Sequence, residues 1–314
     1  MTSTLAYFKN GIGNWILMTP ALQAMASMEK SGKINVVLDS DWSDSRKPAV
    51  LDLVKSAPFV NRVIQYPAEA LDPRKYTKWF YSRHSEGSPA MKLCETMNPT
   101  VGHKINWKTS LMHEMDYYMN IARTCFDYAG ETPRMFMHRD PIPPGILQAL
   151  NERESWVALC NGGFGKMRGP KCWPHYNALA SALRLRYGVS IVGVGGKDEL
   201  RGVRLDLDLT NELTIGQTAS VLAEECDHFI TTDTGLMHIA DALGVGICMT
   251  VLFGGSIVSK NGPVGHSSIL RAEVNCVPCQ YVGYFDHCKD AKCMKELTVG
   301  SVMRSLARGR AVVC

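Results

Sequence analysis

The stretch from Phe229 to Gly254 constrains the fold of this chain more than any other. Its hydrophobic pattern predicts a buried strand, a tight turn, a helix and a second strand, over Phe229–Thr232, Asp233–Gly235, Leu236–Leu243 and Ile247–Phe253. In such a unit the helix begins at the carboxyl end of the first strand. Its free N–H groups and positive dipole end then face the edge where open α/β sheets bind ligands. The sequence therefore predicts an anion site at the start of this helix.

Four residues at this turn are suited to binding a phosphate. Gly235 lets the backbone come close to the anion, and Thr234 adds a hydroxyl group. Asp233 can cap the helix, and His238 lies one turn further on and leans back towards the same place.

The rest of the chain alternates strands with helices. Strands are expected at Thr4–Lys9, Ile34–Leu38, Arg62–Gln65, Lys78–Ser82, Trp156–Cys160 and Val189–Val194. Helices are expected at Trp15–Glu29, Val50–Lys55, Leu111–Tyr128, Gly145–Glu154, Tyr176–Tyr187, Ile215–Cys226 and Val299–Arg308. This alternation predicts βαβ units and parallel sheets, which is an α/β fold class.

The chain is long enough, at 314 residues, for two domains. Three prolines within Asp140–Pro144 stiffen the backbone and prevent a helix or strand from running through. We place the domain junction there, which predicts an N-terminal Rossmann-like domain over residues 1–140 and a C-terminal one over residues 145–300.

A glycine-rich basic loop over Asn161–Gly169 follows a predicted strand of the second half. Lys171 comes just before a helix, where its ammonium can point at a diphosphate without help from a metal. An ordinary solvated lysine is the alternative interpretation. Lys166 and Arg168 are secondary candidates for the same role.

The opening loop has Gly11 and Gly13, but Ile16 stands where a dinucleotide fingerprint has its third glycine. The sequence thus argues against a nicotinamide cofactor. Gly13 either allows a simple strand-to-helix turn or lets the backbone approach a donor phosphate. Further along, Asp39-Ser-Asp41 is similar to a metal-binding Asp-x-Asp, but it lies in a polar loop and we expect no metal there.

Four of the 11 cysteines are grouped near the C-terminus, at Cys276, Cys279, Cys288 and Cys293. This spacing is compatible with a tetrahedral structural zinc site, although the second pair is more widely spaced than usual. Reduced structural thiols and a disulfide are the alternatives.

The overall charge does not indicate a nucleic-acid partner, because 34 basic and 30 acidic residues give only +4. Peripheral contact with a membrane surface is compatible with this charge. The N-terminus lacks the pattern of a signal peptide, and no apolar run approaches the roughly 20 residues of a membrane span. We therefore expect a cytoplasmic protein.

Four motifs, in order, resemble those of glycosyltransferase family 9, the ADP-heptose:lipopolysaccharide heptosyltransferases. They are the opening Gly11–Leu22, Lys171-Cys-Trp-Pro174, Gly195–Glu199 and the stretch Asp233–Gly254. The resemblance implies a GT-B fold, in which two Rossmann-like domains face each other across a cleft. It also implies that the last helix and tail, residues 301–314, return to the first domain.

By this resemblance the second domain binds a nucleotide-diphospho-sugar donor of the ADP-heptose type. Transfer to a glycan or another hydroxyl acceptor on the first domain would invert the anomeric carbon and need no cofactor. Lys171, the amides of Thr234 and Gly235, and His238 would stabilise the departing diphosphate. An acidic residue would bind the ribose, for which Asp198 is the first choice and Glu199 the substitute.

The family's expected general base is an aspartate after Gly13, where this chain has Asn14. An amide cannot accept the proton at neutral pH. His84, Glu86 and Asp41 are the candidate replacements. Two other interpretations stay open: a donor-binding protein with little turnover, and a sugar-nucleotide epimerase of the same fold.

Overall fold

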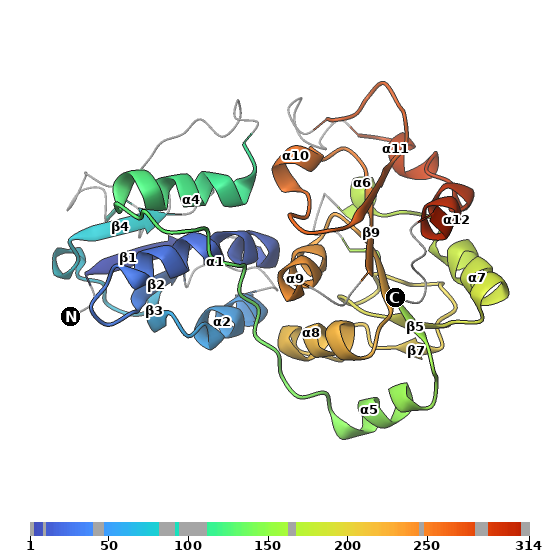
Figure 1. Cartoon of the computed structure of the whole chain (residues 1–314), viewed down its shortest axis with the longest axis horizontal. Coiled ribbons are helices and arrows are strands. Elements are labelled where there is room, and N and C mark those ends of the chain that lie inside the picture. Colours follow the sequence, from blue (N-terminus) through green and yellow to red (C-terminus); the bar gives the residue numbers. More distant parts are fainter. Residues whose placement is uncertain are drawn as a thin grey trace. The chain divides into compact units, whose positions relative to one another are not determined.

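The computed structural model describes residues 3–8, 11–39, 47–81, 92–93, 112–162, 168–244, 248–279 and 288–308. The chain divides into two compact units, Met1–His138 and Arg139–Cys314 (Figure 1). Each unit contains one sheet of parallel strands with helices packed on it. The predicted α/β class with two parallel sheets is confirmed.

The sheet of unit 1 has four parallel strands in the order β3-β2-β1-β4. They are β1 (Thr4–Phe8), β2 (Ile34–Asp39), β3 (Val60–Tyr66) and β4 (Lys78–Tyr81). The chain passes from β1 through β2 to β3 and then crosses to the other side of β1. The switch point of this sheet therefore lies between β1 and β4, which is where open α/β sheets bind ligands.

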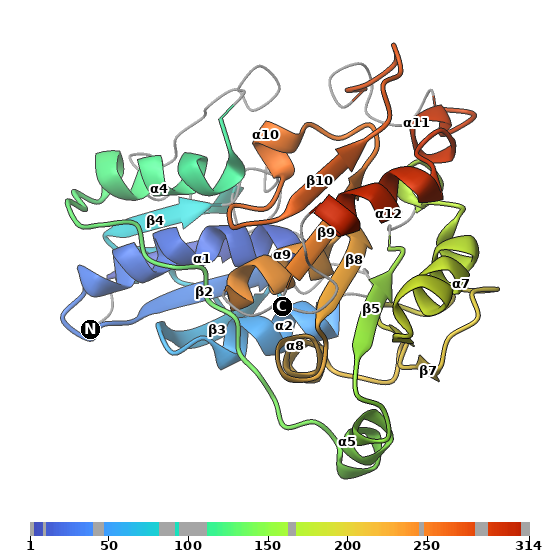
Figure 2. The same ribbon diagram turned by 45° about the vertical axis from the view of Figure 1, so that its right-hand side comes forward.

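The helices of unit 1 are α1 (Ile12–Ser27), α2 (Lys47–Ser56), the short η1 (Pro73–Lys75) and α4 (Glu114–Cys125). Gly11 is the N-cap of α1, so the helix begins three residues before the predicted Trp15. Helices α1 and α4 pack side by side (Figures 1 and 2). Gly13 and Asn14 thus lie in the first turn of a helix instead of in a loop.

The sheet of unit 2 has six parallel strands in the order β10-β9-β8-β5-β6-β7. They are β5 (Trp156–Cys160), β6 (Ser190–Gly193), β7 (Leu207–Asp208), β8 (His228–Thr232), β9 (Cys248–Phe253) and β10 (Ser268–Arg271). Strands β5 and β8 are neighbours although the chain runs outwards to β7 between them. Their junction is the switch point of this sheet.

Eight helices of the described chain belong to unit 2. They are α5 (Pro144–Asn151), α6 (Arg168–Lys171), α7 (Tyr176–Tyr187), α8 (Ile215–Glu224), α9 (Gly235–Leu243), α10 (Val258–Asn261), α11 (Lys292–Lys295) and α12 (Val299–Arg308). Thr214 and Gln217 form a capping box at α8, and Gly188 ends α7 in the left-handed region at φ 71°. None of the helices in the described residues has the length and apolar character of a membrane span.

Helix α12 packs on unit 2, in contact with α7 and β10 (Figure 2). Val302 and Leu306 lie in the core cluster that contains Trp173 and Leu183. The apolar face of α12 is therefore buried against unit 2 over the described residues 301–308. The return of residues 301–314 to the first domain stays a prediction.

Trp173 fixes the C-terminal segment to this core. The side chain is 1% exposed, and its Nε1–H donates to the carbonyl oxygen of Leu297 at 2.7 Å. We predict that Trp173→Ala lowers the free energy of unfolding by about 3–5 kcal/mol, because it leaves a large cavity. Trp173→Phe keeps most of the packing and should cost about 1–3 kcal/mol through the lost donor. Urea unfolding followed by circular dichroism measures both, and a loss below about 1 kcal/mol for the alanine variant would contradict this role.

Candidate active site

The carboxyl ends of four strands in unit 2 bring polar residues to one edge of the sheet, here called the switch-point edge. Gly162 follows β5, Glu199 follows β6, Asp233 follows β8, and Ser256 follows β9. Because the strands are parallel, these loops emerge on the same side of the sheet. The first and last of these residues, Gly162 and Ser256, are 94 positions apart in sequence, and the fold brings all four to one edge.

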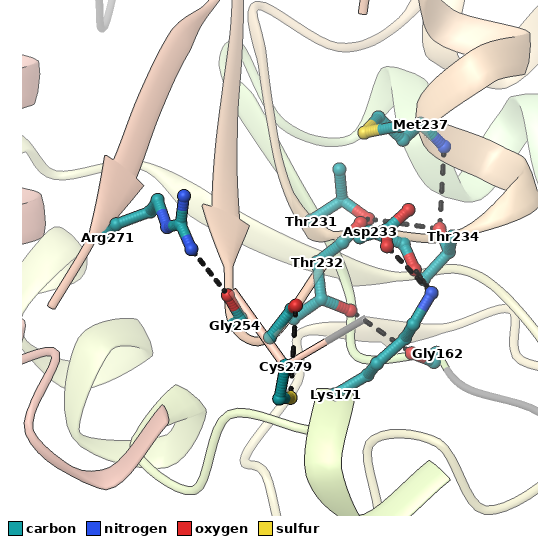
Figure 3. Close-up of polar contacts among 11 residues, drawn as sticks. Gly162, Lys171, Thr231, Thr232, Asp233, Thr234, Met237, Gly254, Arg271 and Cys279 are labelled. Atoms are coloured by element: carbon teal, nitrogen blue, oxygen red, sulfur yellow. Dashed lines mark hydrogen bonds and ion pairs between the residues drawn. The ribbon is translucent and has the colours of Figure 1, made fainter. Parts of the chain in front are cut away.

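Lys171 and Asp233 form an ion pair at this edge, at 2.6 Å between Nζ and Oδ2 (Figure 3). Their side chains are 14% and 9% exposed, so little water screens the pair. The ammonium also lies 3.5 Å from the carbonyl oxygen of Asp233. Lys171 is therefore held beside the turn that begins α9, as the sequence predicts.

The surroundings of Asp233 keep it ionised. Burial would by itself raise the pKa of this carboxyl group, but the charge and hydrogen bond of Lys171 outweigh it. A hydrogen bond from Ser256 and the nearby His238 act in the same direction, and the pKa of Asp233 lies below its ordinary value. Asp233 is thus ionised at neutral pH and pairs with the ammonium of Lys171.

The start of α9 presents backbone donors next to this pair. Thr234 is the N-cap, and its hydroxyl accepts from the N–H of Met237 at 3.4 Å. The amides of Gly235 and Leu236 come before the first hydrogen bonds of the helix, so they point outwards with its positive dipole end. Thr232 fixes the neighbouring loop by donating to the carbonyl oxygen of Gly162 at 3.1 Å (Figure 3). This arrangement can bind an anion.

Glu199, the substitute choice for the ribose, lies at the switch-point edge. A methyl group added at Gly162 would lie 3.0 Å from Oε2 of Glu199 and 2.9 Å from Cγ2 of Thr234. The carboxylate also lies 3.5 Å from Sγ of Cys160. Asp198, the first choice, has a φ of 62° and pairs with Arg201 at 3.2 Å in a more exposed position. The two neighbouring acids thus have different surroundings, and the contacts with Gly162 and Cys160 belong to Glu199.

The pKa of the Cys160 thiol agrees with this placement of Glu199. Burial, and then the charge of Glu199, raise this pKa well above its ordinary value. Cys160 stays a neutral thiol that can donate to the carboxylate.

Of the predicted donor-side residues, the structure brings together Lys171, Asp233, Thr234, Gly235 and His238. His238 is 6% exposed, and its charge acts on Asp233. Arg168 begins α6, and Lys166 lies outside the described residues.

In unit 1, the candidate Asn14 contacts an acidic residue that the sequence did not single out. Its Nδ2 donates to Oε1 of Glu114 at 2.7 Å, and the hydroxyl of Tyr118 donates to the same oxygen at 2.9 Å. Glu114 is 0% exposed. It lies 100 positions from Asn14, in the first turn of α4, and no local pattern distinguishes it from a solvated residue.

The other candidate bases, Asp41, His84 and Glu86, lie outside the described residues. Ser256 is a further residue that sequence reasoning missed. The only available signal was the position of Gly254-Gly-Ser256 directly after a predicted strand.

The four grouped cysteines lie near one another. Burial, reinforced by the other three thiols, raises the pKa of Cys293 to about 11. All four are free of disulfide bonds, and the described residues hold no group of three or more side chains placed to bind a metal ion. Cys279 lies with its Sγ 3.8 Å from the carbonyl oxygen of Gly255, beside the end of β9 (Figure 3). A structural zinc ion at these cysteines stays a prediction.

Solved structures with a similar fold include three heptosyltransferase-like proteins. A glycosyltransferase family 9 protein of Veillonella parvula matches with a TM-score of 0.72 and 16% identity, over 97% of this chain and 96% of that one. E. coli ADP-heptose lipopolysaccharide heptosyltransferase II matches with a TM-score of 0.65 and 16% identity, over 98% of both chains. The iron-containing dodecameric heptosyltransferase TibC of E. coli matches with a TM-score of 0.69 and 13% identity, over 99% of this chain and 77% of that one.

No sequence among curated proteins matches this chain. Residues 112–284 match glycosyltransferase family 9 (heptosyltransferase), which is more than half of the chain and includes the whole switch-point edge of unit 2. Together with the shared fold, this match shows that the chain belongs to glycosyltransferase family 9 and is a glycosyltransferase.

Proposed function

We propose that this glycosyltransferase moves a sugar from a nucleotide-diphospho-sugar of the ADP-heptose type to a hydroxyl group of a glycan or another acceptor. The observation that carries this proposal is the convergence of Lys171 with the N-terminus of α9 at the switch-point edge. A departing diphosphate needs positive charge and N–H donors that are already in position. Unit 2 has both, on residues that its own fold orients.

The diphosphate would contact the Lys171 ammonium and the amides of Gly235 and Leu236. Asp233 balances the charge of Lys171 in the free protein, so the dipole of α9 and His238 supply the remaining attraction for an anion. These groups can neutralise the leaving group without a metal ion. We therefore propose metal-independent transfer.

Glu199 is the proposed ribose ligand. Its carboxylate lies against Gly162, Gly195 and Gly196, where the absence of side chains leaves room for the carboxylate itself. The ADP-heptose type of donor is supported by the relatives, since a solved structure of TibC holds ADP-D-β-D-heptose and one of E. coli WaaC holds ADP. The described residues contain no side chain that we can assign to adenine.

Inversion at the anomeric carbon requires a general base that takes the proton of the acceptor hydroxyl. Asn14 cannot take this role, because an amide is not basic at neutral pH. We propose that His84, Glu86 or Asp41 does. Two of these follow β4 in sequence, and β4 borders the switch point of the unit 1 sheet.

One observation favours a second candidate function. Asn14 lies in the first turn of α1, where an aspartate that acts as general base is expected, and its amide donates to Glu114. A protein that binds the donor and transfers the sugar slowly or not at all would account for the missing base. Mass spectrometry of the products formed from nucleotide sugars, with and without glycan acceptors, separates the two functions.

The role of Lys171 can be tested with a charge-matched pair of variants. Lys171→Met removes the cation but leaves Asp233 buried without its partner, which costs about 3–5 kcal/mol of stability. The double variant Lys171→Met/Asp233→Asn removes both charges and should recover most of that loss. We predict that kcat of the double variant stays about 10²–10³-fold below wild type, because diphosphate stabilisation is lost. Recovery of both kcat and stability in the double variant would show that Lys171 only stabilises the fold through the ion pair. The same assay with a chelator tests whether transfer is independent of a metal ion.

The choice between the two neighbouring acids gives a second prediction. Glu199→Gln should weaken binding of ADP by about 10–100-fold, because hydrogen bonds to a charged group contribute about 1.5–3 kcal/mol. Asp198→Asn is the matched control and should bind ADP like the wild type, since Asp198 pairs with Arg201 instead. Isothermal titration calorimetry measures both, and the reverse order of effects would refute the assignment of Glu199.

The proposed general base gives a third prediction. Among His84→Ala, Glu86→Ala and Asp41→Ala, one variant should lower kcat with the acceptor by about 10²–10⁴-fold while donor affinity stays the same. Steady-state kinetics with saturating donor are the measurement. If all three variants keep full acceptor turnover, the base is a different group.

A further inference from the structure

Glu114 is a buried acid that the proposed chemistry does not yet use. The side chain is on the first turn of α4 and is fully enclosed. Asn14 and Tyr118 both donate to its Oε1, at 2.7 Å and 2.9 Å. A buried carboxylate is costly unless it accepts such hydrogen bonds, so these contacts fix its position.

The contact with Glu114 also fixes the orientation of the Asn14 amide. The NH₂ group of Asn14 faces Glu114, because its Nδ2 donates to Oε1 of that residue. Because the amide group is planar, its carbonyl oxygen Oδ1 is on the opposite side from Nδ2 and does not face Oε1 of Glu114. Asn14 is half-buried whereas Glu114 is enclosed, so Asn14 is the member of the pair that a substrate can reach.

The pair lies at the place where unit 1 is built to bind a ligand. Asn14 is in the first turn after β1, and β1 borders the switch point of the sheet. Trp15 packs edge-on against Phe8 at the end of the same strand, with ring centroids 5.4 Å apart. This packing holds the first turn of α1 in place, and with it the position of Asn14.

We propose that Glu114 is a positioning residue that holds the Asn14 carbonyl oxygen towards the acceptor hydroxyl, which donates a hydrogen bond to it. This inference rests on the proposed transfer function and adds a residue to its acceptor side. The acid of this pair is on α4, and the opening helix carries the amide. An aspartate at position 14 would instead place a second carboxyl group within hydrogen-bond distance of Glu114, where like charges repel.

The proposal is tested with four variants of the full-length protein: Glu114→Gln, Asn14→Asp, the exchanged pair Asn14→Asp/Glu114→Gln, and the control Asp116→Asn. Asp116 is in the same helical turn but is exposed, so its variant removes an equal charge from the start of α4. For each variant we would measure the Tm by thermal unfolding, the affinity for ADP by calorimetry, and kcat and KM for the acceptor.

We expect Glu114→Gln to lower kcat/KM for the acceptor by about tenfold or more, with ADP affinity equal to wild type, since a hydrogen bond to a charged group is lost. Asn14→Asp should lower both Tm and turnover, and the exchanged pair should recover part of both, because it again has one carboxylate and one amide. Asp116→Asn should match the wild type in all assays.

Two results would overturn the positioning role. One is a Glu114→Gln variant whose acceptor kinetics equal those of an active wild type. The other is an Asn14→Asp variant that is faster than the exchanged pair. If the wild type itself transfers no sugar, the proposed function is wrong, and the acceptor role of Glu114 is wrong with it. Recovery of Tm in the exchanged pair would then still show whether the side chains at positions 14 and 114 are coupled.

Discussion

The ion pair between Lys171 and Asp233 is the interaction on which the proposed donor site depends. Removing two charges from water is expensive, and a pair as enclosed as this one gains little net stability over apolar residues of the same size. The pair matters because of where it places the lysine. It holds the ammonium of Lys171, on α6, against the turn that begins α9.

The parallel sheet makes this position available. Strands β5 and β8 are neighbours but are separated in sequence by two other strands, so their loops diverge and leave the edge between them open to a ligand. The glycines after β5 and β6 leave space for the carboxylate of Glu199, Thr232 at the end of β8 fixes the loop after β5, and the dipole of α9 adds a positive end. A single topological feature therefore accounts for where the groups of the proposed phosphate site lie.

Much of the fold, and most residues of the cluster at the switch-point edge, could be predicted from local sequence. Strand β5 and helix α7 have the predicted bounds, because one is a short apolar run and the other ends at a glycine in the left-handed region. The residues around Asp233 were found because a strand, a turn and a helix follow one another there. The sequence does not distinguish the two neighbouring acids Asp198 and Glu199, because their different surroundings depend on the backbone conformation and on loops far away in sequence. Glu114 could not be found at all, since its partner Asn14 is 100 positions away and only the packing of α1 on α4 joins them.

Both units contain an enclosed acid that contacts a more exposed polar partner. In unit 2 Asp233 pairs with the ammonium of Lys171, and in unit 1 Glu114 accepts a hydrogen bond from the amide of Asn14. In the function that we propose, each acid orients its partner, towards the donor in unit 2 and towards the acceptor in unit 1.

The most direct measurement of the central claim is a crystal structure of the protein with ADP bound. Our account predicts diphosphate oxygens within about 3 Å of Lys171 Nζ and of the amides of Gly235 or Leu236, with the ribose at Glu199. A diphosphate bound elsewhere on unit 2, with the Lys171–Asp233 pair unchanged and no contact to the start of α9, would contradict it.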